Sequence, residues 1–295
     1  METILISDIL LFVIATFALF IACITDIKKQ EVANWLNFSL LAIALGIRII
    51  AAIITLQFYY FFYAIIAFVL FFILANILYY GKFFGGGDAK LLMAISVVFA
   101  TSPSFYPLLP LLSQNAIEEP FLLSFLVNLF TIGSVYSLVF IGIFAIKNRT
   151  KFVPEFKKIH KETKMLRTIF LMISAIALAL SLFYSIFLLV FFSAILFPYL
   201  YILAKATENS SMIKTVMPQA LKEGDWLMHA VKLKNKTIRP SIHGLNAKDI
   251  EALKKAKKRV VIKYGIPFVP VFLLALIATL FFQNLIFLAI KALFF

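Results

Sequence analysis

Two aspartates stand where long apolar runs meet short polar segments. Asp26 ends the first apolar run of the chain, and Asp88 begins the fourth. An ionisable side chain at the edge of an apolar segment is costly unless it is solvated or paired, so both residues are candidates for function. Two carboxyl groups that lie close together share one proton. Such a pair does general acid–base chemistry, in which one carboxylate activates a water and the other group protonates a carbonyl oxygen.

Asp88 lies in the segment 85–90, which opens with Gly85, Gly86 and Gly87. Each glycine destabilises a helix by about 1 kcal/mol relative to alanine. Glycines also allow backbone conformations and close chain approaches that other residues do not. We expect the three glycines to accommodate the extended backbone of a substrate. The alternative interpretation is a tight turn in which Asp88 caps the next helix.

The two aspartates are expected to lie at opposite kinds of helix end. Asp88 at a helix N-terminus is favoured as the anion, and Asp26 at a helix C-terminus is favoured as the acid. Other chemistries have less support. The chain has no Gly-x-Ser-x-Gly motif, one cysteine (Cys23) and three histidines without ligand spacing. We therefore expect neither a metal nor a cofactor.

The composition indicates the elements that position these residues. Of the 295 residues 63% are hydrophobic, and Phe alone appears 34 times, whereas soluble domains carry roughly 45–50% apolar residues. We predict an all-α polytopic membrane protein, a bundle of about eight transmembrane helices (range about six to eight), with a small cytoplasmic α/β subdomain. The expected spans are 4–25, 35–56, 58–80, 88 to about 112, 121–146, two spans within 169–203 that turn near 181–185, and 266–295.

The net charge of +14 is concentrated in residues 147–168 and 204–263. Loops rich in Lys and Arg mark the cytoplasmic side of a membrane protein, which places both aspartates at the cytoplasmic face. We expect a membrane catalytic core at 1–203 that includes the basic loop 147–168, a basic cytoplasmic subdomain at 204–263, and a C-terminal transmembrane helix at 264–295. The cations suit lipid headgroups, and no recognition motif indicates nucleic-acid binding.

The polar residues inside the apolar runs are interpreted mainly as structural. Arg48 is expected to pair with Asp8 or to snorkel outward. The default role of Asn76, Asn128, Gln283 and Asn284 is hydrogen bonding between helices. Lys90 either orients Asp88 or faces headgroups, and these alternatives stay open.

The segment Gly85-Gly86-Gly87-Asp88-Ala89-Lys90-Leu91 resembles the Gly-x-Gly-Asp-x-Lys-Leu signature of type IV prepilin peptidases. These are membrane aspartic proteases that include the archaeal preflagellin peptidases. Asp26 and Val32-Ala33-Asn34-Trp35-Leu36 resemble the family's first aspartate and the segment after it, with Ala33 in place of the usual proline. Pro267-Phe268 resembles the family's late Pro-Phe motif, and 221–270 resembles the C-terminal region of the archaeal EppA-like branch.

The resemblance implies an aspartic endopeptidase in the cell membrane. It removes the short signal peptide of type IV pilin-like precursors at the cytoplasmic face, with Asp26 and Asp88 as catalytic dyad and water as nucleophile. Asn34, Lys90 and Pro267 are candidate supports of the site. Candidates for receiving the substrate's basic residues are Glu31, Glu223 and Asp225. The sequence leaves the oligomeric state open, and three alternatives remain: a cation-coupled transporter, a non-catalytic scaffold, and a peptidase specific for preflagellins.

Overall fold

The computed structural model describes residues 2–106, 120–233, 236–241 and 243–294. The chain forms two compact units, Met1–Ser137 with Ile266–Phe295 and Leu138–Gly265, and each is described by itself. Among the described residues five helices are long and apolar enough to cross a membrane, or up to seven if each of two bent helix pairs counts as one span. The predicted all-α polytopic membrane architecture is confirmed.

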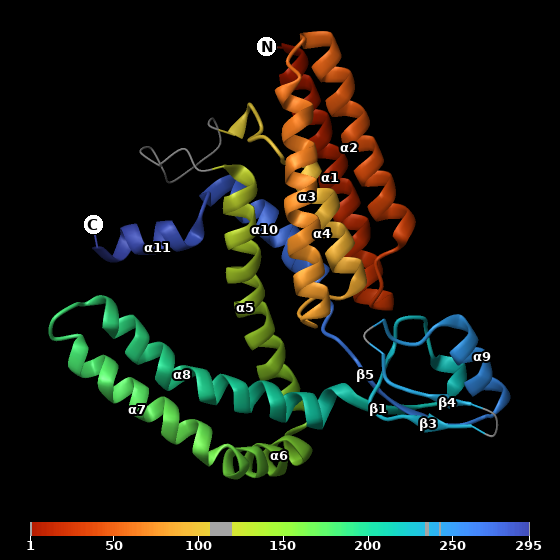
Figure 1. The fold of residues 1–295 in the computed structure, drawn as a ribbon, viewed down its shortest axis with the longest axis vertical. Coiled ribbons are helices and arrows are strands. Elements are labelled where there is room, and N and C mark those ends of the chain that lie inside the picture. The colour runs from red at the N-terminus through yellow and green to blue at the C-terminus, as the bar shows by residue number, and fades with distance from the viewer. Residues whose placement is uncertain (1, 107–119, 234–235, 242, 295) are drawn as a thin grey trace. The chain divides into compact units, whose positions relative to one another are not determined.

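The first unit is a bundle of apolar helices. Helices α1 (Glu2–Lys29), α2 (Asn34–Thr55), α3 (Tyr59–Tyr80) and α4 (Gly86–Val98) lie side by side (Figure 1). Helix α4 packs on α2 and α3, and α10 (Val269–Phe282) packs on α1. Helix α5 (Phe121–Lys147) begins in this unit, and α11 (Leu285–Phe294) follows α10 after a bend of 46°.

Small side chains line the contacts between these helices. In lipid, helices gain little from apolar burial against each other, so close backbone approach over small residues favours packing. Large side chains on the same helices, such as Phe17 and Phe62, are exposed instead. The buried small residues of the bundle include Ala15, Ala22, Ala44, Ala51, Ala64, Ala75, Ala89, Ala94 and Ala275.

Helix α4 is shorter than the span predicted from residue 88 to about residue 112. It ends at Val98 after 13 residues, a length of about 20 Å against a hydrocarbon core of about 30 Å. Its C-terminal carbonyls are bound by a side chain, since Arg48 donates to Val97 O (2.7 Å) and Val98 O (2.8 Å). The expected far end of that span lies outside the described residues. When each bent helix pair is counted as one span, this short helix accounts for the difference between seven spans among the described residues and the expected eight.

Arg48 neither snorkels nor pairs directly with Asp8. Its side chain is fully buried, and its guanidinium lies 4.3 Å from the centroid of the Tyr60 ring. The Tyr60 hydroxyl donates to Asp8 Oδ1 (2.6 Å), and Ser104 N–H donates to Asp8 Oδ2 (2.8 Å). Tyr60 therefore connects the two charged residues.

The second unit contains the end of α5, three further long helices and the strands. The chain forms α6 (Arg149–Glu162), α7 (Lys164–Leu180) and α8 (Ile186–Thr207). Helices α7 and α8 pack as a hairpin, which confirms the predicted turn near 181–185 (Figure 1). The apolar face of α6, with Ile159 at its centre, packs on Ile202 and Ala206 of α8.

Two small sheets and one helix follow α8. The π-helical turn η2 (Glu208–Met212) leads into β1 (Ile213–Val216), and the antiparallel sheet has the order β1-β5-β2. Asn246 Oδ1 accepts the Asp249 N–H (2.8 Å) at the start of α9, as its cap position predicts. The other elements are η3 (Pro218–Ala220), β2 (Trp226–Leu227), the hairpin of β3 (Val231–Lys232) and β4 (Thr237–Ile238), α9 (Ala247–Lys255) and β5 (Val260–Lys263).

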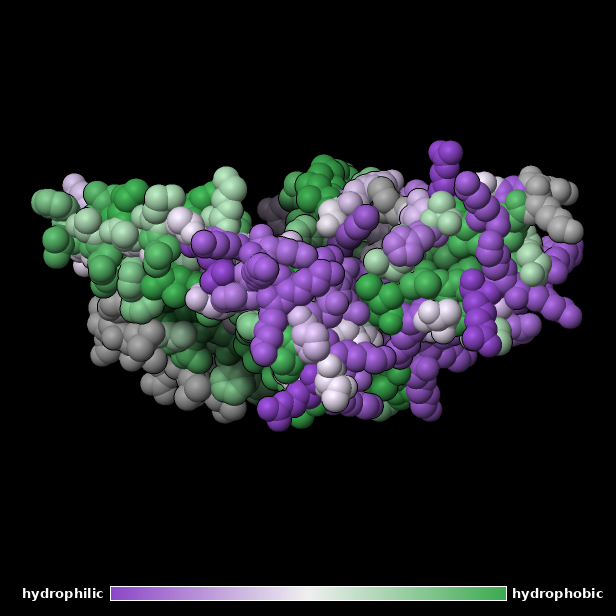
Figure 2. All heavy atoms as spheres, turned by 90° about the horizontal axis from the view of Figure 1, so that it is seen from below, coloured by the Kyte–Doolittle hydropathy of each residue, from purple (hydrophilic) through white to green (hydrophobic). Residues whose placement is uncertain are grey.

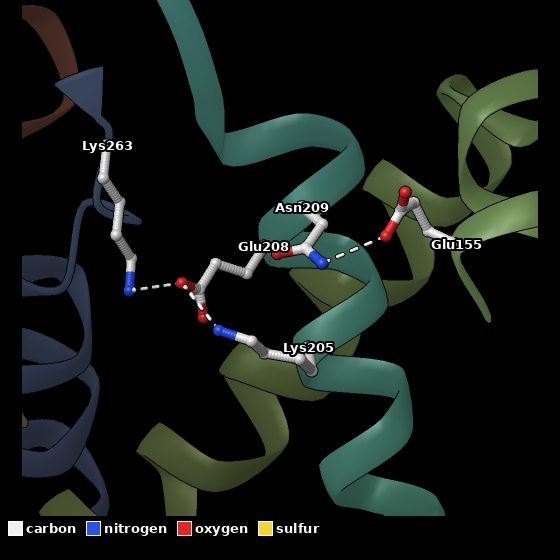
Figure 3. A network of polar contacts seen from close by, with 5 residues as sticks. All are labelled: Glu155, Lys205, Glu208, Asn209 and Lys263. Carbon is white, nitrogen blue, oxygen red and sulfur yellow. Dashed lines mark hydrogen bonds and ion pairs between the residues drawn. The ribbon is translucent and has the colours of Figure 1, made fainter. Parts of the chain in front are cut away.

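A polar network joins the sheet to α6 and α8 within this unit (Figure 3). Glu208 pairs with Lys205 (3.3 Å) and with Lys263 at the end of β5 (3.1 Å). Asn209 donates to Glu155 Oε2 of α6 (3.0 Å). Hydrophilic side chains gather over much of the surface seen from below, beside exposed apolar ones (Figure 2).

Candidate active site

Asp26 lies in the last turns of α1 and is 7% exposed. Its Oδ2 accepts the backbone N–H of Val269 at 2.9 Å, and the Phe268 N–H also interacts with the carboxylate. Val269 is the first residue of α10. The first N–H groups of a helix have no partner within the helix and carry partial positive charge, so they suit a carboxylate. Asp26 therefore caps α10 from a distant part of the chain.

Asp88 lies in the first turn of α4 and is half-buried. Its Oδ2 accepts the N–H of Gly85, the residue before the helix, at 3.1 Å. This is the cap geometry that the alternative interpretation of the glycine segment describes. The cap does not compete with a catalytic role, because one carboxylate offers several further acceptor positions.

The two aspartates lie on neighbouring helices, because α1 and α4 pack on each other. Each carboxylate accepts a backbone N–H at a helix start. Asp88 was expected to be favoured as the anion because it lies at a helix N-terminus, whereas Asp26 lies at a helix C-terminus. The N-terminus of α10 also binds Asp26, so both carboxyl groups lie at a helix N-terminus. The helix ends alone do not decide which group is ionised.

Gly87 is the position where the glycine segment requires the absence of a side chain. A Cβ there would lie 3.0 Å from Val32 Cβ and 3.4 Å from Val32 N. The space beside Gly87 is therefore filled by the protein's own segment between α1 and α2. A Cβ at Gly86 would lie 3.6 Å from the Tyr79 ring, an ordinary contact.

Two contacts connect the start of α2 to the start of α4. Lys90 Nζ donates to Asn34 Oδ1 (2.7 Å), so both predicted supports lie together. Asn37, which is 2% exposed, donates from Nδ2 to Gly87 O (3.2 Å). The side-chain contact of Lys90 is thus to Asn34, and the chain around Asp88 is bound to the segment that follows Asp26.

The third predicted support, Pro267, precedes α10. Its carbonyl oxygen accepts the hydroxyl of Tyr136 on α5 at 2.9 Å. Sequence reasoning missed Tyr136, Asn37 and the Val269 N–H. Asn37 could have been found, because it lies one helical turn after Asn34. Nothing in the sequence distinguishes Tyr136 from other aromatic residues of its apolar run, and nothing marks the backbone N–H of Val269.

Of the three acids proposed to receive basic substrate residues, Glu31 alone belongs to the unit that contains Asp26 and Asp88. Glu31 is exposed in the segment after α1. Glu223 and Asp225 belong to the other unit. Asp225 accepts the Lys222 N–H (2.9 Å), and burial raises the pKa of its carboxyl above the usual range.

The fold and the site define a polytopic membrane protein in which Asp26 and Asp88 lie at the ends of two packed helices. Residues 13–146 match the type IV leader peptidase family. The match includes Asp26 and Asp88 and covers less than half of the chain. It gives no support to a transporter, and it ends before 221–270, where the resemblance to the EppA-like branch lies. No curated protein and no solved structure matches the chain.

Proposed function

We propose that this protein is an aspartic endopeptidase that removes the signal peptide of type IV pilin-like precursors at the cytoplasmic face of the membrane. The observation that carries the proposal is that Asp26 and Asp88 lie on the packed helices α1 and α4, each bound by a backbone N–H at a helix start. The family match over residues 13–146 supports the same chemistry.

The mechanism uses one shared proton. The ionised member of the dyad takes a proton from a water, and the resulting hydroxide forms a bond to the scissile carbonyl carbon. The protonated member gives its proton to the carbonyl oxygen. When the tetrahedral intermediate collapses, the carbon–nitrogen bond breaks, the leaving nitrogen takes a proton from one carboxyl group, and a hydroxyl of the intermediate returns its proton to the other carboxylate. The dyad ends with one proton, as it began.

The charge pattern supports cleavage at the cytoplasmic side. Lys28 and Lys29 lie in the last turn of α1, directly after Asp26, and basic residues next to a span favour the inside. A precursor whose basic segment precedes an apolar helix would present the peptide bond between them at this depth. We assign the chain to the archaeal EppA-like branch on residues 221–270 as part of the same proposal.

Co-expression with a pilin-like precursor tests the proposal. The precursor is expected to shift to a smaller size with the wild-type chain. The single variants Asp26→Asn and Asp88→Asn are each expected to lower cleavage about 100-fold or more, because each removes a proton-transfer group. Glu251→Gln is the matched control, since Glu251 is exposed and pairs only with Lys255 among the ion pairs described.

Cleavage retained by either aspartate variant would contradict the two-carboxylate mechanism. A preflagellin offered in parallel separates the two substrate classes. Cleavage of the preflagellin alone would contradict the pilin-like assignment and leave the chemistry in place.

A further inference from the structure

Helix α5 contacts α10 at both ends of α10. At the far end Asn128, which is fully buried, donates to Thr279 Oγ1 (2.9 Å) and accepts the N–H of Leu285 (2.9 Å). These contacts bind the break between α10 and α11. They are the helix-to-helix hydrogen bonds that the sequence predicts for Asn128.

At the near end two residues of α5, one helical turn apart, contact the segment that precedes α10. A Cβ at Gly133 would lie 2.8 Å from Phe268 Cζ, so the glycine leaves room for the Phe268 ring. Tyr136 donates its hydroxyl to Pro267 O (2.9 Å). Residues three apart on a helix share a face, so Gly133 and Tyr136 form one docking surface for Pro267 and Phe268.

The peptide group between Pro267 and Phe268 connects this surface to the candidate site. Its carbonyl accepts the Tyr136 hydroxyl, and its N–H, on Phe268, interacts with the Asp26 carboxylate. A trans peptide is planar, and its C=O and N–H point in opposite directions. Fixing the carbonyl therefore fixes the direction of the N–H. A hydrogen bond accepted by the carbonyl also polarises the group and strengthens its N–H as a donor.

We infer that Tyr136 is a positioning residue for the catalytic dyad: its hydroxyl orients the Pro267–Phe268 peptide group, and the N–H groups of Phe268 and Val269 then hold the Asp26 carboxyl group and stabilise the singly ionised dyad. The inference rests on the proposed function. Pro267, Phe268 and Val269 lie outside residues 13–146, so the family match does not assign this role.

The role predicts a catalytic effect without an effect on substrate binding. Tyr136→Phe keeps the ring and removes only the hydroxyl. The weaker donor is expected to lower kcat about fivefold, since one hydrogen bond corresponds to about a factor of ten in rate, with KM unchanged. Because the ionised dyad loses stabilisation, the acid limb of the pH–activity profile is expected to move upward by about half a unit. A purely structural contact would lower the thermal stability and leave that limb in place.

The experiment measures precursor cleavage by purified full-length protein in detergent micelles between about pH 4 and pH 9, with thermal unfolding as the check on folding. Tyr201→Phe is the matched control, because Tyr201 is 44% exposed on α8. Gly133→Ala is the second variant: its Cβ displaces the Phe268 ring, so it is expected to lower kcat and to move the acid limb in the same direction.

The outcomes that would overturn the inference are as follows. A kcat and an acid limb equal to the wild type in folded Tyr136→Phe would overturn the inference while Asp26→Asn remains inactive. If Tyr136→Phe does not fold, an unshifted limb in Gly133→Ala overturns it. If Asp26→Asn itself retains cleavage, the proposed function fails and the inference fails with it.

Discussion

Backbone N–H groups and the absence of a side chain at Gly87 position the residues of the candidate site. Asp26 and Asp88 each accept backbone N–H groups, and Gly87 lets the segment around Val32 come close to α4. The chain therefore positions its carboxyl groups mainly with main-chain donors, which hold a charge without adding a second titrating group.

Gly87→Ala is expected to impair cleavage although alanine is the better helix former. The gain in helix propensity is about 1 kcal/mol, but the new Cβ would lie 3.0 Å from Val32 Cβ and 3.4 Å from Val32 N. The backbone of Val32 cannot move out of the way by a side-chain rotation. Helix α4 must therefore shift, and Asp88 shifts with it. We expect a loss in kcat of about tenfold or more, measured on the co-expressed precursor.

Gly142→Ala is the matched control for this change. It lies in the same chain on α5 with no atom within 4 Å of its Cβ position, so the propensity gain stands alone there. Equal cleavage by the Gly87→Ala and Gly142→Ala variants would show that the approach of Val32 is unimportant.

At the scale of elements, Arg48 determines where α4 ends. Its guanidinium donates to the carbonyls of Val97 and Val98 and to Tyr60 O (3.0 Å). Arg48→Met is expected to lower the free energy of unfolding by about 3 kcal/mol, because several buried carbonyls lose their donor and each unsatisfied group costs about 1–3 kcal/mol. Thermal unfolding in micelles measures the loss, and Arg149→Met, at an exposed arginine, serves as control. Similar stabilities of the two variants would contradict this role.

The helix boundaries, including the end of α4, show which features of the fold can be predicted from hydropathy. Apolar runs predicted 35–56, 58–80 and 121–146, and the helices are Asn34–Thr55, Tyr59–Tyr80 and Phe121–Lys147. The length of a helix in lipid follows from local hydropathy, so these predictions needed no distant contact. The end of α4 depends on Arg48, far away in sequence, and hydropathy continued past it. Likewise the acids at 26 and 88 could be found by type, but the Val269 and Phe268 N–H groups that bind Asp26 could not.

At the scale of the whole molecule, the proposed function requires one orientation in the membrane. Asp26 and Asp88 lie at the ends of α1 and α4 next to the cations Lys28, Lys29 and Lys90. If that end faces the cytoplasm, then the turn between α2 and α3 faces outward, because α2 leads away from that end and α3 returns to it. The basic residues of 147–168 favour this arrangement, since cytoplasmic loops carry the excess of Lys and Arg.

Single-cysteine labelling tests the orientation. Cys23 is the one cysteine of the chain, so Cys23→Ala gives a clean background for Phe58→Cys, at the exposed turn before α3, and Lys158→Cys, on the exposed face of α6. A membrane-impermeant maleimide is expected to label the cysteine at 58 in intact cells and the one at 158 only after permeabilisation. Labelling of position 58 only after permeabilisation would place the two carboxyl groups on the outside. Carboxyl groups on the outer side could not reach a peptide bond at the cytoplasmic face. To do so, the charged ends of α1 and α4 would have to cross the hydrocarbon core, which is energetically costly.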